Sequence, residues 1–322
     1  ITPSGLNLSG TSSADTLTGD IGDDLIKGLG GDDTLSGSSG DDEIQGGDGD
    51  DTIEGDDGND TLYGGAGNDT IDGGAEIDVI YGGDGDDILK DNGDNTIYGE
   101  GGNDQISSAT VESSNKHKVG GRTAGLKVYG GDGDDTITGP VFSFVDAGSG
   151  DDVVTLSLGD GKYLTNLSGG SGYDKLYVAG YGMGSPTSGD RWSDVPFDWS
   201  IVSGFEEIHS SGYPFDEVFT DNVGQAGSTL KIREGYGTYN FTAETDASID
   251  FESRTGEYYS SVTFIGGSLA DTIVSHGSSD NLSGGGGNDS FDAGGGDDTI
   301  TGGAGNDTID GGQGTDIAIF SG

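Results

Sequence analysis

The sequence of 322 residues has no cysteine, five prolines, one methionine and few basic residues, 12 against 59 acidic ones. Without cysteine the chain cannot be a disulfide-stapled scaffold. No run of about 18 apolar residues occurs, so we expect no membrane-spanning helix. The net charge of -47 repels phosphate, which excludes nucleic acid as a partner and also excludes unaided binding to an anionic membrane.

Glycine is abundant instead, with 68 residues, and much of it falls into nine-residue units that follow one another from Gly10 to Lys90. Each unit begins with small, turn-forming residues, carries Asp at its sixth position and places an aliphatic residue at its eighth. Four successive units read GGDGDDTIE, GDDGNDTLY, GGAGNDTID and GGAEIDVIY, beginning at Gly46, Gly55, Gly64 and Gly73.

This repeat predicts a coil of short strands joined by glycine turns. Glycines at positions one, two and four permit φ > 0, so six residues form an open turn whose carbonyls point inward. The other three residues form a short strand, in which alternation turns the eighth side chain into the core. Two units per coil, with parallel strands about 4.8 Å apart, bury a continuous aliphatic ladder. We therefore expect an all-β parallel β-roll, a right-handed β-solenoid, with an inward ladder of Ile26, Leu35, Ile44, Ile53, Leu62, Ile71, Ile80 and Leu89.

The same stacking places each sixth-position Asp beside the Asp two units later. Because a column of carboxylates repels itself, it requires a cation between neighbouring turns. Carboxylate and carbonyl oxygens in six- to eight-fold coordination select Ca²⁺ over Mg²⁺ or Zn²⁺. High charge and low hydrophobicity are typical of disordered chains, so we expect the calcium-free chain to be disordered. Calcium bound at about a dozen turns cancels roughly half of the excess negative charge and makes a compact form possible. We predict a chain that folds when several calcium ions bind.

The repeat is not uniform along the chain. After Lys90 the unit DNGDNTIY is one residue short and carries Asn95 where Asp is expected. We divide the sequence into an N-terminal roll (1–107), a basic insertion (108–129), an irregular roll (130–177), an aromatic-rich β segment (178–265) and a C-terminal roll (266–322). The basic insertion is interpreted either as a docking loop for an acidic partner or as a solvated excursion. Because the sequence begins without Met or a signal region, we expect a piece of a longer protein.

Residues 178–265 contain both tryptophans and most of the aromatic residues. Alternating polar and apolar residues predict strands of about five to seven residues, either in a small inserted domain or in a calcium-free continuation of the coil. The aromatics either fill a core or, where exposed, stack on a sugar or another partner. Trp192 and Trp199 are the expected exposed pair and the candidate ligand-binding residues.

Motifs that carry catalysis are missing from the sequence. It has no H-E-x-x-H zinc helix, no G-x-S-x-G elbow and no phosphate-binding G-x-x-x-x-G-K loop. Its three histidines are far apart in sequence. Acidic residues are too abundant to indicate a glycosidase pair, and those to test lie among the aromatics, namely Glu206, Glu207, Glu217, Glu234 and Glu257. We predict that the chain is not an enzyme.

The repeat G-G-x-G-x-D-x-U-x resembles the RTX, or haemolysin-type calcium-binding, family. The resemblance covers Gly10–Ser107, Gly130–Tyr177 and Gly266–Ile319, well over half of the chain. It implies a parallel β-roll, calcium as the cofactor, export from a Gram-negative bacterium by type I secretion machinery, and folding outside the cell. It also implies that the metal ligands are loop carbonyls and the sixth-position aspartates, which are Asp24, Asp33, Asp42, Asp51, Asp60, Asp69, Asp78, Asp87, Asp104, Asp135, Asp152, Asp174, Asp271, Asp280, Asp289, Asp298, Asp307 and Asp316.

In RTX proteins the roll accompanies proteases, lipases, epimerases, pore-forming toxins, adhesins and surface-layer proteins. The piece GGSGYDKLYV, followed by GFEEI, resembles adhesin and surface-layer members. We expect a calcium-binding structural module of a secreted or cell-surface protein. One alternative is an adhesin module that binds a glycan or surface ligand through residues 178–265. Another is an accessory module of a secreted polysaccharide-active enzyme or protease.

Overall fold

The computed structural model describes residues 5–91, 95–108, 126–139, 142–158, 166–180, 202–205, 207–211, 217–219, 230–233, 238–242, 248–252 and 261–320. Within these ranges every regular element is a β-strand. They contain no long apolar helix of the kind that crosses a lipid bilayer. The chain forms two compact units, Ile1–Gly172 (unit 1) and Tyr173–Gly322 (unit 2).

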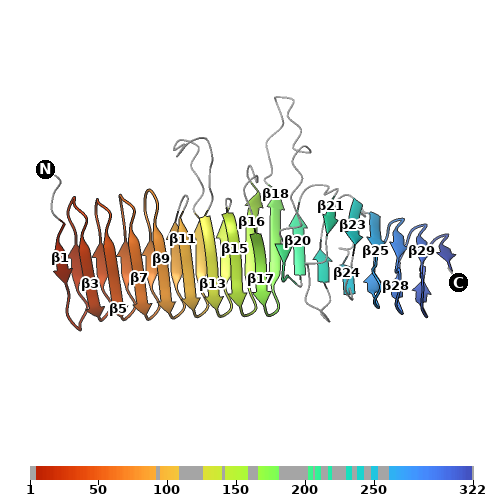
Figure 1. Cartoon of the computed structure of the whole chain (residues 1–322), viewed down its shortest axis with the longest axis horizontal. Coiled ribbons are helices and arrows are strands. Elements are labelled where there is room, and N and C mark those ends of the chain that lie inside the picture. The colour runs from red at the N-terminus through yellow and green to blue at the C-terminus, as the bar shows by residue number, and fades with distance from the viewer. Residues whose placement is uncertain are drawn as a thin grey trace, which may run out of the picture. The chain divides into compact units, whose positions relative to one another are not determined.

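Unit 1 is a coil whose successive strands alternate between two parallel sheets (Figure 1). Each strand pairs with the strand two places further along, so that Ile44 of β5 aligns with Leu62 of β7. One sheet contains β1 (Asn7–Ser9), β3 (Leu25–Gly30), β5 (Glu43–Asp48), β7 (Thr61–Ala66), β9 (Val79–Asp84), β11 (Thr96–Gly101), β13 (Leu126–Asp132), β15 (Phe142–Ser149) and β17 (Asn166–Ser171). The other contains β2 (Thr16–Thr18), β4 (Thr34–Ser36), β6 (Thr52–Glu54), β8 (Thr70–Asp72), β10 (Ile88–Asp91), β12 (Gln105–Ser108), β14 (Thr136–Gly139) and β16 (Val153–Leu158).

Unit 2 follows the same rule, again with parallel pairs two strands apart. One sheet runs through β18 (Lys175–Gly180), β20 (Glu207–Ser211), β22 (Leu230–Arg233), β24 (Ser248–Glu252), β26 (Thr272–Val274), β28 (Ser290–Asp292) and β30 (Thr308–Asp310). Another runs through β21 (Glu217–Phe219), β23 (Thr238–Thr242), β25 (Ser261–Ile265), β27 (Asn281–Ser283), β29 (Thr299–Thr301) and β31 (Ile317–Ile319), and the unit also contains the short strand β19 (Val202–Ser203). The predicted all-β parallel β-roll, with a β-rich non-repeat segment within it, is confirmed.

The core of each unit is a ladder of eighth-position side chains. All eight residues predicted for this ladder in unit 1 are at most 1% exposed. In unit 2 the eighth-position residues Ile273, Leu282, Phe291 and Ile300 are also buried. The central residue of a short strand is less exposed than its neighbours, as in Thr52–Glu54, where only Ile53 is buried, because alternate side chains of a strand point to opposite faces.

Glycine is favoured in the turns because successive coils approach one another closely there. Gly65 has φ +124°, and a Cβ atom on it would collide with the carbonyl oxygen of Gly47 in the coil before. Such a conformation is accessible to glycine at little cost, whereas larger residues at the equivalent position of other units, such as Asp56 with φ +75°, adopt it with strain.

The 18-residue period is interrupted in the middle of unit 1. Tyr98 of β11 aligns with Tyr81 of β9, only 17 residues earlier, because the unit after Lys90 is one residue short. Tyr129 of β13 then aligns with Tyr98, 31 residues earlier. The longer spacing arises from residues 109–125, which lie between β12 and β13 and outside the described residues. Most of the predicted basic insertion falls in this range.

In residues 178–265 the described strands continue the parallel pairing. Strand β20 pairs with β18 and with β22, and β24 pairs with β22 and with β26, the first strand of the C-terminal repeats. The backbone of unit 2 therefore keeps the coil through the described part of a segment that lacks the nonapeptide pattern. The predicted tryptophan pair, Trp192 and Trp199, lies outside the described residues.

Candidate metal centres

Each sixth-position aspartate is the residue directly before a strand. Of the 18 predicted ligands all but Asp307 and Asp316 are at most 3% exposed, and these two, near the end of unit 2, are partly exposed. Burial of so many carboxyl groups is unfavourable unless each one is neutralised, hydrogen-bonded or bound to a metal.

One oxygen of the carboxylate takes part in the coil itself. Asp69 Oδ1 accepts the backbone N–H of Asp51 at 2.8 Å, and Asp87 Oδ1 accepts that of Asp69 at 2.8 Å. The same bond recurs along the coil, and in unit 2 it joins Asp280 to the N–H of Val262 at 2.8 Å. Through this bond each aspartate fastens its turn to the coil before it.

The other oxygen, Oδ2, lacks such a contact in many of these residues. Within the described part of the chain Oδ2 is buried and has no hydrogen-bond partner in Asp33, Asp42, Asp51, Asp60, Asp69, Asp78, Asp87, Asp104, Asp135, Asp289 and Asp298. A buried oxygen left in this way costs about 1–3 kcal/mol, and more when it is charged. A bound cation removes that cost, so these oxygens fit the predicted metal.

A backbone carbonyl lies beside these oxygens. At Gly46 a Cβ atom would lie 2.6 Å from the carbonyl oxygen of Gly64 and closer still to Asp51 Oδ2. Glycine at the first position thus keeps open a space bordered by carboxylate and carbonyl oxygens, the donor set that Ca²⁺ prefers. Among the described residues no three His, Cys, Asp or Glu side chains converge on one point, so carbonyls would supply much of the coordination.

Burial changes the proton affinity of the candidate ligands. It raises the pKa of Asp60, Asp69, Asp78 and Asp104 from 3.8 to about 7, and that of Asp135 to about 8. The backbone N–H bond opposes the effect of burial on these pKa values, and repulsion from nearby carboxylates adds to it. Protons therefore compete with calcium near neutral pH, and a bound cation displaces them.

Among the described residues, Asp24 and Asp280 have a protein donor at Oδ2. Asp24 Oδ2 accepts the backbone N–H of Asp20 at 2.7 Å. Asp280 Oδ2 accepts the hydroxyl of Ser275 at 2.7 Å, and this serine stands where most units have their first glycine. A bound cation therefore stabilises these two carboxylates less than it stabilises the aspartates whose Oδ2 has no hydrogen-bond partner.

A parallel β-roll with a buried carboxylate at nearly every turn defines a calcium-binding repeat module. The RTX calcium-binding nonapeptide repeat (4 copies) matches residues 9–44, 36–71, 45–79, 63–90, 91–109, 127–139, 265–300 and 291–318. These matches cover more than half of the chain, which belongs to the RTX calcium-binding repeat family. No curated protein matches it. RTX repeats bind calcium, and the resemblance seen in the sequence is confirmed.

The other candidate residues are not brought together in the described structure. Glu207 begins β20 and Glu217 begins β21. The remaining glutamates among the aromatics, Glu206, Glu234 and Glu257, lie outside the described residues, as do Trp192 and Trp199. The described residues thus offer no grouping that tests an enzymatic or glycan-binding role.

Sequence reasoning missed a ladder of aromatic rings on the outer face of unit 1. Tyr63, Tyr81, Tyr98 and Tyr129 stack in this order, with ring centroids 4.9 Å apart and planes within 11° of parallel. Phe144 follows Tyr129 at 5.0 Å. The signal in the sequence is a Tyr directly before the first glycine of alternate units. Because the inner rings cover one another's faces, the ladder suits contact between strands better than stacking on a sugar.

Proposed function

We propose that the chain is a non-catalytic structural module of a secreted or cell-surface bacterial protein, and that its β-roll folds outside the cell when calcium binds. The observation that carries this proposal is the row of buried Oδ2 atoms without a hydrogen-bond partner in the described residues. Those oxygens destabilise the ordered coil when no cation is bound, and they become its ligands when calcium is present.

Binding and folding are coupled because the site does not exist in the extended chain. Asp51 Oδ2 and the carbonyl of Gly64 are 13 positions apart in sequence and meet only when the coils stack. The free energy of calcium binding therefore offsets the entropy lost when the turn becomes ordered. Since Asp69 also fastens its turn to the N–H of Asp51, ordering of one coil prepares the next, and the transition is cooperative.

Calcium concentration then decides where the chain folds. Extracellular calcium modules bind with dissociation constants of about 10⁻⁴–10⁻³ M, so cytosolic calcium leaves such sites empty. An acidic, glycine-rich chain stays unfolded under those conditions and passes through a type I secretion channel as an extended chain. Millimolar calcium outside the cell fills the sites, and the rigid roll forms after export.

Circular dichroism of the whole chain, in chelator and during a calcium titration, tests the proposal. We expect a disordered spectrum in chelator and a cooperative gain of β-structure, with a midpoint at about 0.1–1 mM calcium. Magnesium is the control, because it has the same charge but a smaller radius and retains its water. A chain that is equally β-rich in chelator, or that folds equally well with magnesium, contradicts the proposal.

The non-catalytic part of the proposal has a separate test. The calcium-loaded chain is incubated with a panel of polysaccharides and with casein, and the products are analysed by mass spectrometry. We expect both substrates to remain intact, whereas calcium-dependent cleavage of either one would show that the module is itself an enzyme.

A further inference from the structure

The turn after Lys90 departs from the repeat at two positions at once. The first position, where most units have glycine, is Asp91, and the place of the sixth-position Asp is taken by Asn95. The sequence alone presents this as a unit that has lost its calcium ligand. The described structure shows both side chains completely buried in the coil.

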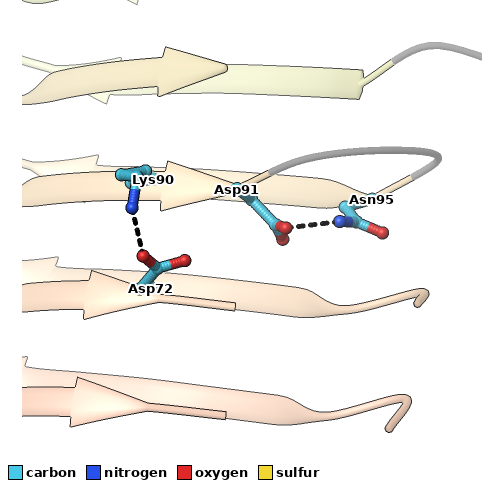
Figure 2. Close-up of polar contacts among 4 residues, drawn as sticks. All are labelled: Asp72, Lys90, Asp91 and Asn95. Atoms are coloured by element: carbon cyan, nitrogen blue, oxygen red, sulfur yellow. Dashed lines mark hydrogen bonds and ion pairs between the residues drawn. The ribbon is translucent and has the colours of Figure 1, made fainter. Parts of the chain in front are cut away.

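Strand alternation turns Asp91 inward. Strand β10 (Ile88–Asp91) is one residue longer than β8 (Thr70–Asp72), and its burial alternates so that Leu89 and Asp91 are buried while Lys90 is exposed. Lys90 on the outer face forms an ion pair with Asp72 (Figure 2). The first position of a unit faces inward, as at Gly64 of β7 and Gly82 of β9, so Asp91 places a carboxylate where most units have no side chain.

Asn95 connects this carboxylate to the column of aspartates. Its Oδ1 accepts the backbone N–H of Asp78 at 3.0 Å, as a sixth-position Asp does in other turns. Its Nδ2 donates to Asp91 Oδ1 at 2.5 Å, and Figure 2 shows the two side chains turned toward one another. An amide has both an acceptor and a donor, so Asn95 keeps the bond between coils and positions Asp91 at the same time.

The carboxylates of Asp91 and Asp78 approach the same point. A Cβ atom at Gly73 would lie 2.9 Å from Asp78 Oδ2 and closer still to Asp91 Oδ2. Asp78 is fully buried, and this Oδ2 has no hydrogen-bond partner among the described residues. Because Ca–O distances are about 2.3–2.6 Å, one ion between the two oxygens contacts both.

We infer that Asp78 and Asp91 form a calcium site of their own, in which Asp91 replaces the carboxylate that Asn95 lacks and Asn95 acts as a positioning residue. The site keeps two carboxylates from neighbouring coils, so the register slip does not remove an ion. In unit 1 this site is also the last one in the column of stacked aspartates that contains Asp78. In the next coil the residue aligned with Asn95 is Leu126, which is buried, and the neighbouring Lys127 donates its N–H to the carbonyl of Asn95.

This inference rests on the proposed function, and counting ions tests the two separately. Native mass spectrometry of the full chain, at a fixed millimolar concentration of free calcium, gives the number of ions bound. We expect Asp91→Asn to bind one calcium fewer than the unaltered chain. The matched control Asp84→Asn removes the same charge from an exposed side chain, and we expect it to bind the full number.

A rescue variant separates loss of the site from loss of the fold. In Asp91→Asn/Asn95→Asp the carboxylate returns to the sixth position, so we expect the full number of ions even if Asp91→Asn alone does not fold. An unchanged count in Asp91→Asn, or a double variant that folds with one ion fewer, overturns the inference while leaving the proposed function intact. If the unaltered chain binds no calcium, both are wrong.

Discussion

At the residue scale, the two oxygens of a sixth-position aspartate have different roles. Asp69 Oδ1 accepts the N–H of Asp51, a contact within the protein, whereas Asp69 Oδ2 is buried without a hydrogen-bond partner among the described residues. Asparagine at this position retains the first contact but replaces the second oxygen with an amide nitrogen, which does not coordinate a cation. Substitution of Asp by Asn therefore isolates the contribution of the metal from that of the hydrogen bond.

For Asp69→Asn we expect a higher calcium midpoint for folding and a loss of about 1–3 kcal/mol in the free energy of unfolding with saturating calcium. Both quantities come from calcium titration and chemical denaturation, followed by circular dichroism. Asp48→Asn is the matched control, because it removes the same charge from an exposed side chain. Equal effects of the two variants would show that net charge alone decides stability.

The sequence predicts which aspartates stack, because stacking depends only on the period of the repeat. It does not predict which of them already have a donor. The hydroxyl of Ser275 reaches Asp280 only through the geometry of the turn. Likewise, Asp91 falls within a shortened unit that looks defective in sequence, and only the structure shows that Asn95 holds its side chain beside that of Asp78.

At the scale of the strand, the sequence predicts the side chains of the inner face better than the contacts on the outer face. The inner ladder follows directly from alternation, so Ile44, Leu62 and Ile80 lie where the repeat places them, at 0% exposure. The outer face has no such constraint, and the stacked tyrosines were missed because each one, taken singly, is an ordinary strand residue. Only the parallel register, in which Tyr63 aligns with Tyr81 and Tyr81 with Tyr98, brings the rings together.

The tyrosine ladder is expected to stabilise unit 1 independently of calcium coordination. Tyr81 stacks on both Tyr63 and Tyr98, and each such pair contributes about 0.5–1.5 kcal/mol beyond its buried area. Tyr81→Ala should therefore lower the free energy of unfolding of the calcium-loaded chain by about 1–3 kcal/mol, measured by chemical denaturation. Tyr81→Phe retains the stacking and should behave like the unaltered chain, and an equal loss in both variants would assign the effect to the hydroxyl.

At the scale of the whole molecule, bound calcium must offset the repulsion between the many carboxylates of the chain. The chain carries a formal charge of -47, and many of its carboxyl groups are buried in the coil. In the absence of calcium, burial raises the pKa of Asp69 and Asp104 to about 7 and that of Asp87 to about 6. In the unfolded chain such groups have pKa values near 3.9.

The pH dependence of the calcium-free chain follows from this difference. Because the ordered state binds these protons more tightly than the unfolded state, their stabilising effect is present at acid pH and is lost as pH rises through about 6–8. In chelator we expect more β-structure at pH 5 than at pH 8 by circular dichroism. Salt at about 1 M screens surface repulsion but not buried groups, so a transition that disappears in salt would contradict the role of the buried aspartates.

The most direct test is a crystal structure of the calcium-loaded chain with anomalous scattering data that locate each calcium ion. Ions are predicted between neighbouring coils, in contact with Oδ2 of Asp33, Asp51, Asp69, Asp87, Asp104 and Asp135 in one column and of Asp42, Asp60 and Asp78 in the other. An ordered β-roll whose Oδ2 atoms contact only water or protein would contradict the account.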